Sequence, residues 1–307
     1  MLKTNDTAVA VDVNKAQNES IEGPWQMAWK RFRKNKLAMA GGIILILLIL
    51  GAVFAPLISP YTLDHMDYTQ INKPPSAQHW LGTDQLGRDY LTRMLHGSRI
   101  SLQVGVFAVL ISVVLGSLIG GIAGYYGGWV DNLCMRIVEI VMSFPFLPLA
   151  ITVSAVVGAR LPAEFKMYIT MMVIGLLSWT GLARMIRGQI LSLREQEFMQ
   201  AAKALGLSDK RIILKHLLPN TVAYIIVSAT LGMAGAIMTE SALSFLGLGV
   251  APPTPTWGNM VQNARDFYIL TNRPWLWMPP GIAIFLTVMS INLLGDGLRD
   301  ALDPKTK

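Results

Sequence analysis

The chain has 307 residues, of which 52% are hydrophobic and only 15% are charged, whereas ordinary soluble domains carry about 25% charged residues. This composition excludes a typical soluble domain and indicates an integral membrane protein. The net charge of +7 at pH 7 is explained by basic residues at a cytoplasmic membrane face, so we expect no nucleic acid partner. The single cysteine, Cys134, excludes an intramolecular disulfide.

The N-terminal stretch, residues 1–29, is polar and of mixed charge, and it has no short apolar core ahead of a small-residue cleavage site. We therefore expect no cleaved signal peptide. We interpret residues 1–29 as a disordered tail, and the first apolar stretch after it as a retained membrane helix.

Six stretches are long and apolar enough to cross a membrane, because a hydrocarbon core of about 30 Å needs roughly 20 apolar residues in a helix. Backbone polar groups in lipid have no water to bond, so each stretch must be helical. Pro145 and Pro148 predict a kink or a break in the third stretch. The sequence thus predicts an all-α membrane fold whose six spans cover residues 37–58, 100–124, 134–157, 167–185, 221–247 and 277–294.

Lysine and arginine are distributed unevenly around these spans. The stretch before the first span, the connection between the fourth and fifth, and the end of the chain hold 15 of them, whereas the three loops on the other side hold 8. Basic residues favour the cytoplasmic side of a membrane. We therefore expect both termini, and the connection before the fifth span, to be cytoplasmic.

The first outer loop ends in a charged stretch where Leu91 and Leu95 recur at helical spacing. This amphipathic pattern is suited to a helix that lies on the membrane surface or on a neighbouring helix. Asp84, Arg88 and Asp89 precede it. They could dock an external protein, or they could form a hydrogen-bonded cluster that stabilises the loop.

Small and charged residues inside the spans suggest helix contacts. Gly116, Gly120 and Gly124 repeat every four residues, a spacing that favours close helix packing, with a pore-lining role as the alternative. Arg136 and Glu139 lie three residues apart in the third span. That spacing predicts a local ion pair.

The basic connection between the fourth and fifth spans has its own local pattern. Residues 187–205 favour helix, and Gly206 stands where a left-handed residue ends a helix. Ser208 is placed to cap a second short helix, which Pro219 closes. The small residues of this segment would let another protein approach closely; a solvated basic connector is the alternative.

This segment resembles the cytoplasmic motif of ABC-importer membrane subunits, which reads Glu-Ala-Ala, three residues, Gly, nine residues, Ile, any residue, Leu and Pro. The chain departs from it twice, with Gln200 for the glutamate and His216 for the isoleucine. Gln200 keeps a hydrogen-bonding oxygen but loses the charge. The resemblance implies that the segment docks on an ATPase, through the motif residues Gln200, Ala201, Ala202, Gly206, His216, Leu218 and Pro219.

Residues 79–102 and 240–260 resemble signatures of the C-type permease subunits of bacterial oligopeptide and dipeptide importers. With the motif, the resemblance covers residues 25 to 304. It implies a type I ABC-importer permease fold with a core at residues 100–296 and a coupling segment at 187–219. Residues 30–99 would hold the first span and outer loop, and residues 297–307 a cytoplasmic tail.

The resemblance also implies the setting: the bacterial cell membrane, a B-type permease partner, two ATP-binding subunits, an extracytoplasmic peptide-binding protein and a peptide substrate. Within it, Glu240 could face the pathway and meet the amino terminus of a peptide, or it could bond a neighbouring helix.

No catalytic or cofactor-binding pattern stands out. The dipeptide Gly-Lys, which a phosphate-binding loop requires, is absent from the sequence. We therefore expect ATP and Mg to be used by partner subunits, and the chain not to be an enzyme by itself. The four histidines are too scattered to predict a metal site.

Three alternatives remain open at this point. A nickel or other small-solute importer would carry similar membrane signatures. A self-sufficient secondary transporter would place ionisable residues near the bilayer centre and would need no docking motif. A purely structural scaffold is a third reading.

Overall fold

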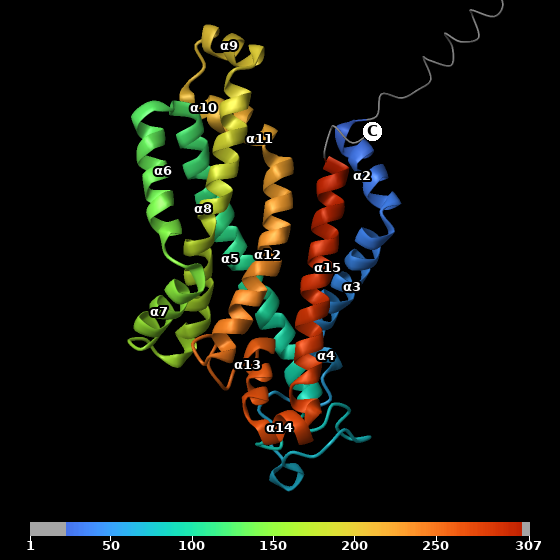
Figure 1. Ribbon diagram of the computed structural model, residues 1–307. Coiled ribbons are helices and arrows are strands. Elements are labelled where there is room, and N and C mark those ends of the chain that lie inside the picture. Colours follow the sequence, from blue (N-terminus) through green and yellow to red (C-terminus); the bar gives the residue numbers. More distant parts are fainter. Residues whose placement is uncertain (1–22, 303–307) are drawn as a thin grey trace, which may run out of the picture.

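A computed structural model describes residues 23–302 of the chain. Long helices run side by side between two ends of the molecule, with α9 and α10 at one end and α13 and α14 at the other (Figure 1). Most of the tail expected at residues 1–29 lies outside the described residues, as does the end of the chain after 302. Residues 24–29, however, already belong to helix α2.

The described residues form no strand, and helices account for most of them. The long helices pack along one another, and short helices connect them at both ends. The helices are α2 (Pro24–Lys34), α3 (Lys36–Val53), α4 (Ala55–Ile58), α5 (Tyr90–Tyr126), α6 (Gly128–Ser143), α7 (Phe146–Gly158), α8 (Lys166–Arg194), α9 (Glu197–Ala204), α10 (Asp209–Ile212), α11 (Leu218–Asn220), α12 (Val222–Phe245), α13 (Trp257–Val261), α14 (Phe267–Asn272) and α15 (Met278–Leu302).

Five of these helices, α3, α5, α8, α12 and α15, are long and apolar enough to cross a membrane. Helices α6 and α7 together satisfy the same test but meet at an angle of 84°. The chain is therefore an all-α membrane protein with six spans if the bent pair is one of them.

The break at Pro145 confirms the sequence prediction. A proline disfavours helical backbone at the residue before it, and Phe144 is extended, with φ −89° and ψ 136°. Pro148 lies in the first turn of α7, where its missing N–H costs no hydrogen bond. The third span is thus two helices.

The amphipathic stretch before residue 100 is the start of α5, a single helix of 37 residues, and not a separate helix on the membrane surface. Asp89 begins the helix, because its carboxylate accepts the backbone N–H of Thr92 at 2.7 Å. Gly97 leaves room for Thr256 and Met260, so the first turns of α5 pack under the loop after α12. Of the two alternatives that the pattern left open, this packing fits a helix that lies on a neighbouring helix, here α13.

Helices α5 and α8 form the most extensive packing in the core. A Cβ added at Gly116 would lie 2.9 Å from the Cβ of Leu182, and one at Gly124 would lie 2.9 Å from the carbonyl oxygen of Arg187. At Gly120 an added Cβ would run into the Ala183 carbonyl. The glycine repeat is therefore a helix-packing surface within this chain, as its spacing predicts.

Candidate functional site

The segment between α8 and α12 forms a projecting helix–turn–helix at one end of the bundle (Figure 1). Helix α9 ends at Ala204, two residues before Gly206, whose φ of +69° is the left-handed conformation that the sequence predicts. The N–H of Gly206 bonds the Lys203 carbonyl at 3.0 Å, and the N–H of Leu207 bonds the Ala202 carbonyl at 3.2 Å. The chain then turns directly into α10.

Two local details differ from the sequence prediction. The helix expected over residues 187–205 is interrupted, because Gln196 is extended with ψ 153° and separates α8 from α9. Ser208 occupies the cap position of α10, but its hydroxyl makes no capping bond. Residues Ile213–Leu217 form a turn of π-helix, which no sequence pattern indicated.

One face of this segment is anchored in the core. Met199, Ala202, Ile212 and Leu217 are buried against Ile186 and Ile190 of α8 in one apolar cluster. Leu218 packs against the same cluster. The segment is therefore held rigidly by the long helices.

The other face of the segment is apolar and exposed. Phe198 and Leu205 are 36% and 79% exposed, and Ala201 is exposed between them. Gln200 and Gly206 are also exposed, and a Cβ added at Gly206 would meet nothing within 4 Å. We call Phe198, Ala201, Leu205 and Gly206 the docking face, and residues 197–212, which form α9, the turn and α10, the docking segment. An exposed apolar group of this kind indicates a protein contact.

The remaining motif residues lie at the return to the membrane. Pro219 is exposed in the first turn of α11, where its missing N–H is harmless. His216 is half-buried, and its backbone carbonyl accepts the Asn220 side chain at 2.6 Å. Between residues 23 and 302 no hydrogen bond involves the His216 side chain, so its backbone carbonyl ties this position to α11.

Polar contacts join the segment to α5. The hydroxyl of Tyr125 donates to the Asp209 carboxylate at 2.6 Å. The guanidinium of Arg194 donates to the Tyr125 carbonyl at 3.2 Å. These bonds fix the last turn of α5 to the end of α8 and the start of α10.

An ion pair that sequence reasoning missed joins α6 to α8. Two guanidinium nitrogens of Arg187 bond both oxygens of the Asp131 carboxylate. Side-chain exposure is 33% for Arg187 and 12% for Asp131, so the pair is only partly shielded from water. Asp131 lies in the first turn of α6, and Arg187 lies about two turns before the end of α8. The only sequence signal for this pair was that Asp131 precedes the third predicted span and Arg187 follows the fourth, which puts both residues on the same side of the membrane.

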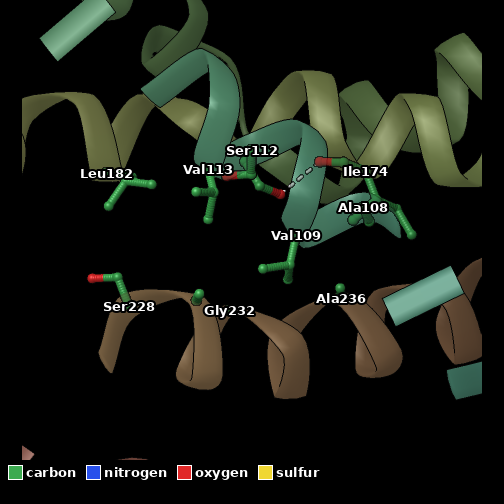
Figure 2. Close-up of a pocket in the computed structure, with 11 residues that line it drawn as sticks. Ala108, Val109, Ser112, Val113, Ile174, Leu182, Ser228, Gly232 and Ala236 are labelled. Carbon is green, nitrogen blue, oxygen red and sulfur yellow. Dashed lines mark hydrogen bonds between the residues drawn. The ribbon is translucent and has the colours of Figure 1, made fainter. Parts of the chain in front are cut away.

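A cavity of about 210 Å³ lies among α5, α8 and α12. Figure 2 shows Ser228, Gly232 and Ala236 of α12 in a row along one wall, facing Val109 and Val113 of α5. Across the cavity, the hydroxyl of Ser178 is bonded to the Ile174 carbonyl at 2.6 Å. The volume is below the roughly 300–1,000 Å³ of whole-ligand pockets.

Glu240 does not line this cavity. Its side chain is fully buried, and Ser244 donates a hydrogen bond to it at 2.8 Å. The hydroxyl of Ser244 in turn accepts the Val250 N–H at 3.2 Å, so Glu240 supports the contact that holds the loop after α12. Gly258 of α13 lies close to the carboxylate, because a Cβ added there would be 3.2 Å from Glu240 Oε2. This placement fits the alternative in which Glu240 has a structural role beside a neighbouring helix.

Asp84, Arg88 and Asp89 are brought together in the outer loop, but all three are buried. Asp84 accepts Arg88 Nε at 2.8 Å and lies 3.5 Å from Arg93 Nε. Asp89 pairs with His79 at 2.9 Å in addition to capping α5. These contacts fit the loop-stabilising alternative, because buried side chains offer no surface to a receptor.

The local ion pair expected in the third span is confirmed. Arg136 Nη1 lies 3.1 Å from Glu139 Oε2, and both side chains are largely exposed. Both lie on α6, so the pair links no second helix of this chain.

Two models of known protein families match the sequence of this chain. Residues 112–307 match the family model of the binding-protein-dependent transport system inner membrane component. Residues 23–75 match the N-terminal transmembrane domain of oligopeptide transport permease C.

Whole-chain relatives agree with these matches. The dipeptide transport system permease protein DppC of Alkalihalophilus pseudofirmus is 45% identical over 284 residues, which cover 92% of this chain and 91% of the relative. The glutathione transport system permease proteins GsiD of Escherichia coli O1:K1 / APEC and of Shigella boydii serotype 4 are each 45% identical over 290 residues, covering 94% of this chain and 93% of theirs. The chain therefore belongs to the family of binding-protein-dependent transport system inner membrane components and is a permease subunit of the C type.

Proposed function

We propose that this chain and a related B-type permease subunit together form the membrane pathway of an ATP-driven importer of oligopeptides or dipeptides. The docking face carries this proposal. It is an exposed apolar surface on a segment whose opposite face is buried against α8. A surface built in this way suits transmission of force from a second protein into the bundle.

The partners follow from this arrangement. Two ATP-binding subunits hold ATP and Mg and contact the docking face, and this chain supplies no catalytic residue. A peptide-binding protein delivers substrate at the opposite end of the bundle. In this proposal the docking segment and both termini lie in the cytoplasm of a bacterial cell, which the distribution of basic residues supports.

The contacts of the segment suggest how movement is transmitted. Closure of the ATP-binding subunits displaces α9 and α10 as one body, since their inner faces share an apolar cluster with α8. The bonds from Tyr125 to Asp209 and from Arg194 to Tyr125 carry the displacement to α5. Helices α5 and α8 cannot slide apart easily, because their glycines are in close backbone contact. The pathway therefore opens and closes by movement of packed helices.

Peptides are preferred over nickel or another small solute as the cargo, because the relatives are named for dipeptides and glutathione. A secondary transporter would have no use for a docking face. We place specificity mainly in the separate binding protein, because the cavity of about 210 Å³ is too small for a whole peptide.

Cross-linking tests the docking role directly. Cys134 is the single cysteine, so Cys134→Ser gives a cysteine-free background. In the assembled complex, Ala201→Cys on this background should cross-link to an ATP-binding subunit. Asn272→Cys, exposed on α14 at the other end, is the matched control and should not. Cross-linking from both positions, or from neither in a complex that imports peptide, would contradict the proposal.

A further inference from the structure

A second cavity, of about 290 Å³, lies near the start of α5. Arg99 is 26 positions before Tyr125 on this helix, which at about 1.5 Å per residue places it roughly 40 Å from the docking segment. The cavity is therefore at the end of the bundle where the proposed function brings substrate in. Its lining residues are Leu63, His96, Arg99, Ile100, Gln103, Thr254 and Pro255.

Arg99 is the distinctive group of this cavity. Its side chain is exposed, and it makes no hydrogen bond or ion pair with any residue between 23 and 302. The two preceding arginines of this region differ, because Arg88 and Arg93 both share the Asp84 carboxylate. None of the lining side chains is acidic. The guanidinium of Arg99 thus has all its N–H donors available to a ligand.

The surroundings of Arg99 suit one chemical group. A guanidinium bonds a carboxylate through two parallel N–H bonds, which are among the strongest hydrogen bonds in proteins. Gln103, one turn away on the same face of α5, adds an amide donor. Leu63, Ile100 and Pro255 supply apolar walls that accommodate a side chain.

The size of the cavity limits what it holds. At about 290 Å³ it lies just under the range of roughly 300–1,000 Å³ for whole-ligand pockets. It therefore accommodates one end of a peptide and not the whole molecule.

We propose that this cavity binds the carboxylate end of a transported peptide as it enters the membrane-spanning part, with Arg99 as the binding residue. The inference rests on the proposed function and assigns to it a specific subsite. It predicts that the complex distinguishes a peptide with a free C-terminal carboxylate from the same peptide with a C-terminal amide.

The test compares uptake of a tripeptide and of its C-terminal amide by the complete complex in proteoliposomes. Arg99→Gln should lower uptake of the free acid about tenfold or more, as expected for loss of a charge-assisted bond. Uptake of the amide should stay unchanged, which also shows that the variant is folded. Both complexes use the same binding protein, so any preference of that protein cancels in the comparison.

Arg160→Gln is the matched control, because Arg160 is exposed and lies outside the cavity. This variant should keep the acid-to-amide ratio of the unmodified complex. Arg99→Lys, which keeps the charge but not the planar fork, should restore part of the ratio.

Three results would overturn the inference: equal losses for acid and amide in Arg99→Gln, no loss at all, or an Arg99→Gln defect that appears only in vesicles containing phosphatidylglycerol and vanishes in vesicles of phosphatidylethanolamine alone. The last would assign Arg99 to lipid phosphate. If the unmodified complex imports neither peptide, the proposed function fails, and this inference fails with it. An unchanged ratio in an import-active complex refutes the subsite alone.

Discussion

The hydroxyl of Tyr125 donates a hydrogen bond to the carboxylate of Asp209 at 2.6 Å, although the two residues are 84 positions apart. This bond is a direct link between the long helix α5 and the docking segment. Removing it with Tyr125→Phe leaves the apolar ring in place. Because Asp209 is exposed to water, we expect the contact between α5 and α10 to lose only about 1 kcal/mol of free energy.

Such a loss should lower the amount of peptide imported per ATP hydrolysed by about fivefold, the factor that corresponds to about 1 kcal/mol. Uptake and ATP hydrolysis measured together in proteoliposomes give this ratio. Asp209→Asn retains an acceptor oxygen and serves as the control, so it should preserve the coupling better than Asp209→Ala. An unchanged ratio in Tyr125→Phe would show that the bond transmits nothing.

Gly206 should tolerate side chains in an order set by backbone conformation and not by space. Its φ is +69° and an added Cβ would meet nothing, so the penalty for a non-glycine residue is about 1–2 kcal/mol of local strain. Asn adopts this conformation more readily than Ala or Val. In the chain without ATP-binding subunits, where the docking face is free, we expect hydrogen exchange of residues 197–212 to rise in the order Gly, Asn, Ala, Val. Equal behaviour of Asn and Val would contradict this account.

Gly120 should be intolerant of any added side chain. A Cβ there would run into the Ala183 carbonyl, so Gly120→Ala forces α5 away from α8 and should lower stability by about 2 kcal/mol or more. Gly188 in α8 is the matched control, since its Cβ position is open. Gly188→Ala should raise stability by roughly 0.5–1 kcal/mol through helix propensity. Thermal unfolding in detergent measures both changes, and a similar shift for the two variants would refute the packing argument.

Glu240 should prove replaceable by glutamine but not by leucine. Glutamine keeps oxygen and nitrogen groups for Ser244 and its neighbours, so Glu240→Gln should transport at nearly normal rates. Glu240→Leu leaves the buried Ser244 hydroxyl without its acceptor, which costs about 1–3 kcal/mol. Uptake assays combined with thermal unfolding separate the two effects. A stable Glu240→Gln complex with abolished uptake would instead support a pathway role for the carboxylate.

Features repeated along the chain were predictable from the sequence. Apolar length located the six spans, Pro145 located the break, and the spacing of Gly116, Gly120 and Gly124 indicated packing. Gly206 was predicted correctly because a left-handed residue at a helix end has a strong residue preference.

Features that depend on tertiary contacts were not predictable. Asp131 and Arg187 are 56 positions apart, and no periodicity connects them. The sequence left the Asp84 cluster open between a docking site and a loop-stabilising cluster, because charge normally indicates surface. Only the structure shows that Asp84 and Asp89 are each satisfied by a neighbour inside the loop. The extended Gln196 has no proline or glycine beside it to mark the helix end.

The bend between α6 and α7 limits how the chain can sit in a bilayer. Helical bonding stops at Ser143 and resumes with the Leu149 N–H on the Pro145 carbonyl, and residues 142–148 are all exposed on this chain. Hydrocarbon cannot solvate peptide groups released in this way. This corner must therefore turn toward a neighbouring subunit or toward water, and lipid is excluded from it.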